Sequence, residues 1–236
     1  MRFNILKYIS HYKYKIEFHA HTTPELPGYK MITLLKNQGY HAVMLTNHFL
    51  CSMDNRLNGE EYVKNFLEEL YSVKEEGIRQ GIKVFMGAEI RFEESRNEYL
   101  VLGVNNELLN NILQCGGIEE FHNRFHKDDI LVIQAHPFRN HCGCFPVNPD
   151  FIDGMEIMNM HTGQMSSNAV ASDYAAKRFS IVTAGSDAHC CEHIGLSALK
   201  TKVLPESEKE LLEILTNKEY IFEIGKCPML PHAFFK

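Results

Sequence analysis

Residues 15–21 read KIEFHAH, a short run of strand-forming residues that ends in two histidines separated by one residue. Because side chains alternate along a strand, His19 and His21 lie on the same face and can hold one ion together. The stretch therefore predicts a β-strand that delivers a pair of imidazoles to one end of a sheet.

Four later apolar runs also end in a histidine, a carboxylate or both. They end in Thr46-Asn47-His48, Gly87-Ala88-Glu89, Ala135-His136-Pro137 and Gly185-Ser186-Asp187-Ala188-His189. Each motif alone has an ordinary structural explanation, since acids cap helices and Gly, Ser and Asp favour turns. That explanation would have to hold at five strand ends at once. The set as a whole therefore predicts a metal site built from histidines and acids.

Apolar runs of strand length alternate with segments of helical periodicity along the chain. The expected strands are 15–19, 41–46, 82–92, 99–104, 130–135, 154–158, 181–184 and 220–224; the expected helices are 31–38, 59–80, two short ones within 106–127, 168–178 and 206–217. Such alternation is typical of parallel strands joined by right-handed crossovers, and it favours a closed α/β barrel over an open sheet. In such barrels the active site lies at the carboxyl ends of the strands, where the five motifs fall.

Length and composition agree with one globular domain. Barrels of this kind run to about 250 residues as one unit, so the 236 residues predict a single domain over 1–236. The net charge of −6 and the absence of a long basic run argue against binding to duplex nucleic acid. The sequence shows no signal peptide, no apolar run of membrane-spanning length and no disulfide pattern among its seven cysteines. We therefore expect a cytoplasmic protein that does not bind membranes and has reduced thiols.

The five motifs, in this order, resemble those of the polymerase and histidinol phosphatase (PHP) family, over residues 17–199. The resemblance implies a single-domain, distorted (β/α)7 barrel that hydrolyses phosphate esters with a hydroxide bridging two metal ions. It implies two or three divalent ions. The ligand set suits Mn²⁺ or Zn²⁺, with Fe²⁺ as a further choice.

The resemblance also implies a role for each motif residue. His19, His21, Glu89 and Asp187 would bind one metal, Glu89 would bridge to a second that His136 also holds, and His48 and His189 would contribute to a third. The reaction would depend on Glu89 and Asp187 as catalytic residues because both hold the ions in place.

The sequence departs from the family pattern at three places. Asn47 stands where the family usually has an aspartate, which removes a charge next to the ligands. The Ser-Asp-Gly that usually follows the first motif is missing, and only Glu25 offers a carboxylate in that region. A histidine is often found between the Glu and His-Pro motifs, where this chain has Glu98. The sequence therefore leaves the ligands of the third metal site undecided, and Glu25, Glu98 and His161 are candidates to replace the missing family residues.

A phosphate ester also needs groups other than metals. Arg139, three residues beyond His136, is the candidate phosphate clamp because a guanidinium fits two phosphate oxygens. His193 and His141 lie on the same loops as the ligands and are candidates to protonate the leaving group. Asn159, which follows another strand, is a candidate substrate-binding residue. We expect a small phosphorylated substrate, either a phosphomonoester or a small nucleotide.

Other functions stay open. A histidinol-phosphatase specialist or a phosphoesterase for short oligonucleotides would use the same residues. An amidohydrolase barrel also begins with H-x-H, but it commonly carries a metal-bridging lysine or a second H-x-H pair where this chain has Glu89. A barrel that binds metal without turnover is a further alternative. The sequence leaves open the substrate, the metal, the oligomeric state and the general acid.

Overall fold

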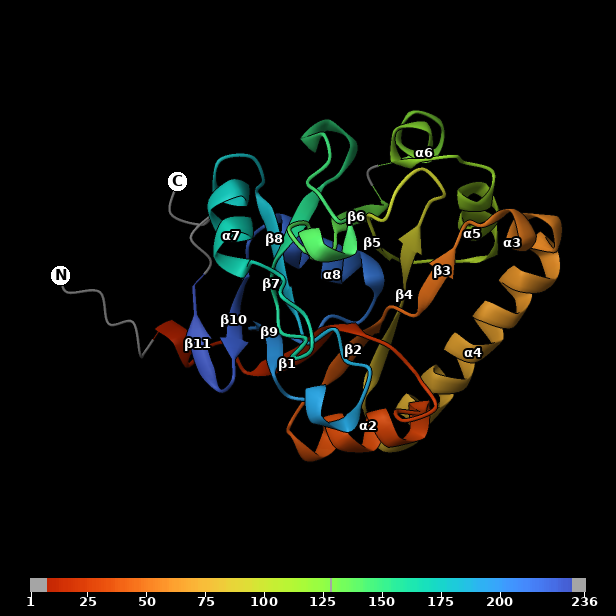
Figure 1. The fold of residues 1–236 in the computed structure, drawn as a ribbon. Coiled ribbons are helices and arrows are strands. Elements are labelled where there is room, and N and C mark those ends of the chain that lie inside the picture. The colour runs from red at the N-terminus through yellow and green to blue at the C-terminus, as the bar shows by residue number, and fades with distance from the viewer. Residues whose placement is uncertain (1–7, 128, 231–236) are drawn as a thin grey trace.

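The strands of this protein form one strongly curled sheet (Figure 1), in a computed structural model that describes residues 8–127 and 129–230. The strands are β1 (Tyr14–Ala20), β2 (Ala42–Leu45), β3 (His48–Leu50), β4 (Lys83–Arg91), β5 (Tyr99–Leu102), β6 (Leu131–Gln134), β7 (Gly154–Asn159), β8 (Ile181–Gly185), β9 (Ser197–Thr201), β10 (Tyr220–Ile224) and β11 (Cys227–Met229). Their order is β11-β10-β9-β1-β2-β4-β5-β6-β7-β8, and β3 pairs with β4 outside this path.

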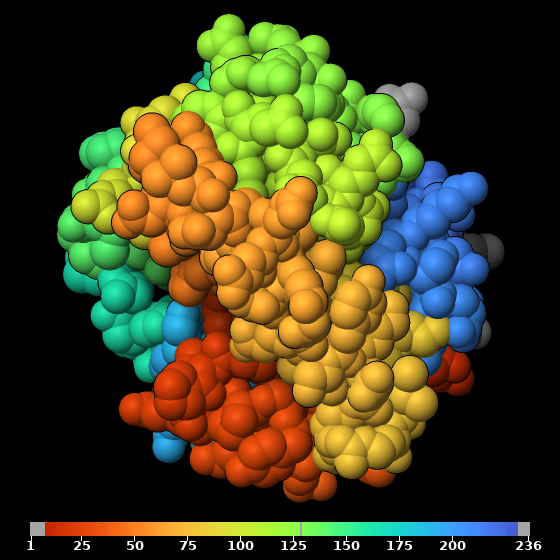
Figure 2. Space-filling model, turned by 90° about the vertical axis from the view of Figure 1, so that its right-hand side faces the viewer, coloured from red at the N-terminus to blue at the C-terminus, as the bar shows by residue number. Residues whose placement is uncertain are grey.

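Helices cover the outside of the curled sheet (Figure 1). They are α2 (Gly28–Asn37), α3 (Met53–Leu57), α4 (Gly59–Gln80), α5 (Asn106–Leu113), α6 (Ile118–Phe125), α7 (Asn168–Ala176) and α8 (Glu208–Thr216). The long helix α4 buries an apolar stripe that includes Phe66, Leu70 and Val73, and it ends at Gly81, whose φ of 77° favours glycine. Figure 2 looks onto the outer face of α4, flanked by α2 and by α5 and α6. No helix among the described residues has the length and hydropathy needed to cross a bilayer.

The central strands are parallel, as the sequence predicts. Strand β1 pairs with β2, and β2 pairs with β4, both in parallel register. Strands β2 and β4 are apolar and buried along nearly their whole length, which is expected where both faces of a parallel sheet are covered. The carboxyl ends of these three strands therefore meet at one edge of the sheet.

Two parts of the predicted topology are wrong. Strand β5 is antiparallel to both β4 and β6, because residues 92–98 are too short a connection for the crossover that parallel strands need. Strands β3, β9 and β11 and helix α3 were not predicted; β9 is antiparallel to β1 and β10. The α/β class holds, but the seven-stranded count is not confirmed, since the described residues contain eleven strands.

The curl of the sheet brings its first and eighth strands together. Ala20 at the end of β1 forms a parallel bridge with Ala188, just beyond β8. The amide of His21 donates to the Ala188 carbonyl at 2.9 Å, and the amide of Ala188 donates to the His19 carbonyl at 3.2 Å. The first and last of the predicted motifs are therefore neighbours in space.

Candidate metal centre

Glu89 lies at the middle of the predicted cluster. It stands inside β4, so its carboxylate does not cap a helix, and its side chain is 1% exposed. One oxygen, Oε1, lies 3.2 Å from Nε2 of His19 and 3.0 Å from Nε2 of His136. The other, Oε2, lies 2.9 Å from Nδ1 of His48 and 3.5 Å from Nε2 of His21. The two oxygens thus face two different pairs of imidazoles.

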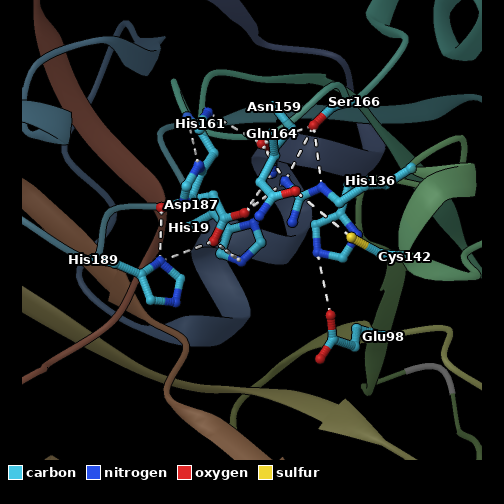
Figure 3. Close-up of polar contacts among 12 residues, drawn as sticks. His19, Glu98, His136, Cys142, Asn159, His161, Gln164, Ser166, Asp187 and His189 are labelled. Carbon is cyan, nitrogen blue, oxygen red and sulfur yellow. Dashed lines mark hydrogen bonds and ion pairs between the residues drawn. The ribbon is translucent and has the colours of Figure 1, made fainter.

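Asp187, two residues beyond the end of β8, also contacts the buried histidines. Its Oδ1 lies 3.3 Å from Nε2 of His21 and 3.5 Å from Nε2 of His19 (Figure 3). Both Asp187 and His136 have a positive φ, 50° and 27° respectively. Positive φ is costly for residues other than glycine and occurs often at functional sites. The surrounding structure therefore holds both residues in backbone conformations that are unfavourable for residues other than glycine.

The predicted ligands converge in four overlapping groups, each with its donor atoms within 4.8 Å of one another. The groups are His19, His21 and Glu89; His19, His136 and Asp187; His21, His48 and His189; and His48, Glu89 and Glu98. Together they contain all seven predicted metal ligands.

Several donor atoms in these groups lack a hydrogen-bond partner although they are buried. They are Nε2 of His19, both ring nitrogens of His21, Oε2 of Glu89 and Nδ1 of His136. Some lie close to an oppositely charged atom but are not aligned with it as donor and acceptor. Buried polar groups are rarely left unpaired, because each unpaired group costs about 1–3 kcal/mol. Imidazole and carboxylate donors that converge without partners fit a divalent ion such as Zn²⁺ or Mn²⁺.

The charge states agree with a cation site. Burial opposes ionisation of Glu89, but His19, His136 and His48 together hold the pKa of its carboxyl well below the usual value. Burial lowers the pKa of His21 to about 3, so this imidazole is neutral and its unprotonated ring nitrogen can offer a lone pair to a metal. Two carboxylates and several imidazoles in a buried space therefore form a donor set that a divalent cation would balance.

A family model described as PHP-associated matches residues 166–219, which contain β8 and the Asp187 to His189 motif. This segment of the chain is similar to the PHP-associated family. No curated protein sequence matches the chain.

Solved structures share the fold of this chain at low sequence identity. A two-domain protein from Bacteroides vulgatus, described as containing a predicted PHP-like metal-dependent phosphoesterase, matches with a TM-score of 0.66 and 16% identity over 94% of this chain and 69% of that one. PsfC from Pseudomonas syringae matches with a TM-score of 0.55 and 16% identity, over 87% and 96% of the two chains. An amidohydrolase from Chromobacterium violaceum with bound sulfate matches with 0.52 and 13%, over 84% and 95%. These likenesses establish the fold.

Glu98, one of the candidate replacements, lies beside two of the predicted ligands. It lies just before β5, and because β5 runs antiparallel to β4, this end of β5 is beside the carboxyl end of β4. Its Oε2 lies 3.5 Å from Nε2 of His136 (Figure 3). Its Oε1 lies 3.7 Å from Nδ1 of His48. Of the three candidate replacements, only Glu98 joins a ligand group among the described residues. Glu25 is exposed, and the His161 ring lies edge-on to His189 and tilted against His193.

The predicted phosphate clamp, Arg139, is buried and paired with a predicted metal ligand. Its Nη2 donates to Oδ2 of Asp187 at 2.8 Å and to Oδ1 of Asn159 at 2.8 Å. The same nitrogen also donates to the hydroxyl of Ser166 at 3.1 Å. Burial opposes the charge on Arg139, but Asp187 raises the pKa of the guanidinium. Arg139 therefore contacts Oδ2 of Asp187, and this contact orients the carboxylate.

The two candidate proton donors contact different residues of the loop that follows β7. His193 is buried, and its Nε2 lies 3.0 Å from the hydroxyl of Thr162, while its Nδ1 accepts from the His189 amide at 3.3 Å. His141 is exposed, and its Nε2 lies 2.7 Å from Oε1 of Gln164. Only His193 therefore has a direct hydrogen bond to a residue of the ligand groups.

Two contacts near the ligands were not predicted. Glu17 accepts hydrogen bonds from the amide and the hydroxyl of Ser186 at 2.9 and 2.6 Å, which ties β1 to the residue before Asp187. Glu17 is two residues before His19, so strand alternation could have placed it on the same side. Asn47 donates from Nδ2 to Oε1 of Glu69 at 2.9 Å. Glu69 on α4 thus brings a carboxylate to the position where Asn47 replaces the family's aspartate.

Proposed function

We propose that this protein is a PHP-like metal-dependent hydrolase of phosphate esters, acting on a small phosphomonoester or nucleotide. The observation that carries the proposal is the position of Glu89, whose two carboxylate oxygens each face a separate pair of histidines. A carboxylate in this position can be shared between two metal ions, and paired ions are a common solution for phosphate-ester hydrolysis.

The ligand groups suggest how the ions would be shared. His19, His21 and Asp187 would hold one ion with Glu89, while His136 and Glu98 would hold a second with it. His48 and His189 would contribute to a third ion. When bound, the ions would stabilise negative charge on the phosphoryl oxygens and make a water molecule acidic enough to attack near neutral pH.

Residues of the chain would supply the remaining functions. Arg139 would keep Asp187 oriented and add positive charge behind the site. His193 would protonate the leaving oxygen, with Thr162 beside it to accept and return a proton. The buried ligands exclude water from the inner site, which strengthens the electrostatic interactions there.

Phosphate esters are preferred over amides for two reasons. The Bacteroides vulgatus protein with the same fold is described as a predicted metal-dependent phosphoesterase. In addition, the position between the histidine pairs is filled by Glu89 and not by a lysine. The Chromobacterium violaceum protein is named an amidohydrolase, so amide hydrolysis is the alternative that the experiment must include.

The decisive experiment combines metal analysis of the purified protein with a substrate screen. The screen would cover alkyl and aryl phosphomonoesters, phosphodiesters, mononucleotides, short 5′-phosphorylated oligonucleotides and amides. We expect bound Mn²⁺ or Zn²⁺ and turnover of one or more phosphate esters. Turnover of amides alone, or metal-loaded protein without any turnover, would contradict the proposal.

A further inference from the structure

Strand β7 supplies no member of the four ligand groups, yet two buried polar side chains lie at its carboxyl end. Glu156 is 1% exposed and Asn159 is 4% exposed. Buried polar side chains are costly unless they are fully hydrogen-bonded, so their partners indicate what they do.

A bulge in β7 lets both side chains reach the same site. Residues three apart on a regular strand point to opposite faces. The pairing of β7 with β8 shifts register between Glu156 and Met158, so that Glu156 is opposite Thr183 while Asn159 is opposite Gly185. A bulge of this kind inserts one extra residue and redirects the side chains that follow. Glu156 and Asn159 consequently contact each other, with Nδ2 of Asn159 donating to Oε2 of Glu156 at 2.9 Å.

Glu156 contacts two of the proposed ligands with separate oxygens. Its Oε1 lies 2.9 Å from Nδ1 of His19. Its Oε2 accepts from the backbone amide of His136 at 3.0 Å, at the residue whose φ is 27°. One carboxylate therefore fixes the ring of one ligand and the strained backbone of another.

Asn159 contacts the third ligand. Its Nδ2 donates to Oδ2 of Asp187 at 3.2 Å, and its Oδ1 accepts from Arg139, which also holds Asp187. His19, His136 and Asp187 form one of the four ligand groups, and they come from three different parts of the sheet. Each of the three is hydrogen-bonded to β7.

We propose that Glu156 and Asn159 are positioning residues that preorganise His19, His136 and Asp187 for metal binding. A proton on Nδ1 of His19, donated to Glu156, leaves the lone pair of Nε2 directed toward Glu89 and Asp187. Carboxylates that hold a metal-binding histidine in this way tune metal affinity in many proteins. The inference rests on the proposed metal centre but not on the identity of the substrate.

The test compares Glu156→Gln with a matched control at the other end of β7. Asp153, just before β7, also accepts from a histidine ring and a backbone amide: Nε2 of His126 at 3.0 Å and the Val132 amide at 2.7 Å. Asp153 contacts no proposed ligand in the described part of the chain. In Glu156→Gln, the new NH₂ group must face a donor, either the His19 ring or the His136 amide. In Asp153→Asn, both donors face the single oxygen Oδ2, which the amide oxygen can replace, so the same chemical change removes a carboxylate charge away from the metal centre.

Mn²⁺ affinity would be measured by titration calorimetry for the wild type, Glu156→Gln and Asp153→Asn, each first stripped of metal. We expect Glu156→Gln to bind Mn²⁺ about 10–100-fold more weakly than the wild type, as for other partners of metal-binding histidines. Asp153→Asn should leave the affinity unchanged. ¹⁵N shifts of the Zn²⁺-loaded wild type should show His19 bound through Nε2 and protonated at Nδ1, and this signature should be lost in Glu156→Gln.

Two results would overturn the proposal. One is a Glu156→Gln protein that is folded and binds Mn²⁺ like the wild type. The other is an equal loss of affinity in Asp153→Asn, which would show a general effect on the fold. If Glu156→Gln does not fold, Asn159→Ala replaces it, with about a 10-fold loss expected; unchanged affinity there would contradict the proposal. A wild type that binds no metal would refute the metal centre itself, and metal binding without phosphate-ester turnover would refute only the proposed reaction.

Discussion

Nε2 of His136 lies 3.0 Å from Oε1 of Glu89, while the other oxygen of Glu89 faces His48 and His21. His136 follows β6 and Glu89 stands in β4, so the contact spans the antiparallel strand β5 that separates them in the sheet. The buried carboxylate therefore joins imidazoles that approach it from both sides.

Glu89→Gln should remove one bound metal per chain. The amide keeps the shape of the side chain but loses the charge that two ions would share, so turnover should fall by more than the about 10–100-fold typical of residues outside the ligand set. Metal content, kcat and melting temperature should be measured on one preparation. Glu120→Gln, on an exposed carboxylate of α6, is the control. Full metal content with near-normal turnover would exclude Glu89 as a shared ligand.

Removal of metal should abolish hydrolysis of a generic aryl phosphate. The donor set is made of imidazoles and carboxylates with unpartnered atoms, which is the chemistry of a divalent-metal site. Chelation followed by dialysis should give inactive protein, and Mn²⁺ or Zn²⁺ should restore activity. Full turnover by protein shown to be metal-free would rule out the metal mechanism.

Arg139→Ala should weaken metal binding as well as turnover. The guanidinium contacts Asp187 at 2.8 Å in a buried pair, and its loss leaves that carboxylate without its partner. Breaking a buried pair in this way costs about 3–5 kcal/mol of stability. Mn²⁺ affinity and the denaturant midpoint would be measured beside Arg124→Ala, which removes a half-exposed arginine. A rise in KM alone, with unchanged metal affinity, would instead identify Arg139 as a simple phosphate clamp.

His193→Gln should slow the hydrolysis of alkyl phosphates much more than that of nitrophenyl phosphate. An alkoxide needs a proton as it leaves, whereas a nitrophenolate is stable without one, so a general acid matters only for the first. A contribution of about 10²–10⁴-fold is usual for such a group. The exposed His11 provides the control substitution. Equal losses on both substrates would show that His193 only supports the His189 loop.

Gly185→Ala should destabilise the protein and disturb the metal centre. A Cβ at this position would lie 2.3 Å from Cβ of His19 and 2.8 Å from Oε1 of Glu156. Overpacking a buried site costs about 1–3 kcal/mol. Gly59→Ala on α4, where the nearest atom would be at an ordinary 3.5 Å, should not lower the melting temperature. A wild-type melting temperature and metal affinity for Gly185→Ala would show that this close approach is not needed.

The sequence by itself predicted the α/β class of the fold and seven of the eight residues in the ligand groups. Strand alternation places His19 beside His21, and buried strands that end in polar residues mark positions such as Glu89, His136 and Asp187. These signals are local, because a strand, its end and the residue that follows are all read within about ten residues. The helix 59–80 was also predicted with its observed bounds, since its apolar periodicity and Gly81 lie in one continuous segment.

Only the tertiary structure decided how the supporting residues are used. The antiparallel direction of β5 brings Glu98 to the ligands, and the bulge of β7 turns Glu156 and Asn159 toward them. The pairing of Arg139 with Asp187 joins residues far apart in the chain. Strand direction, register and ion pairing depend on hydrogen bonds between distant segments, and a single sequence carries no local pattern that specifies which distant groups will meet.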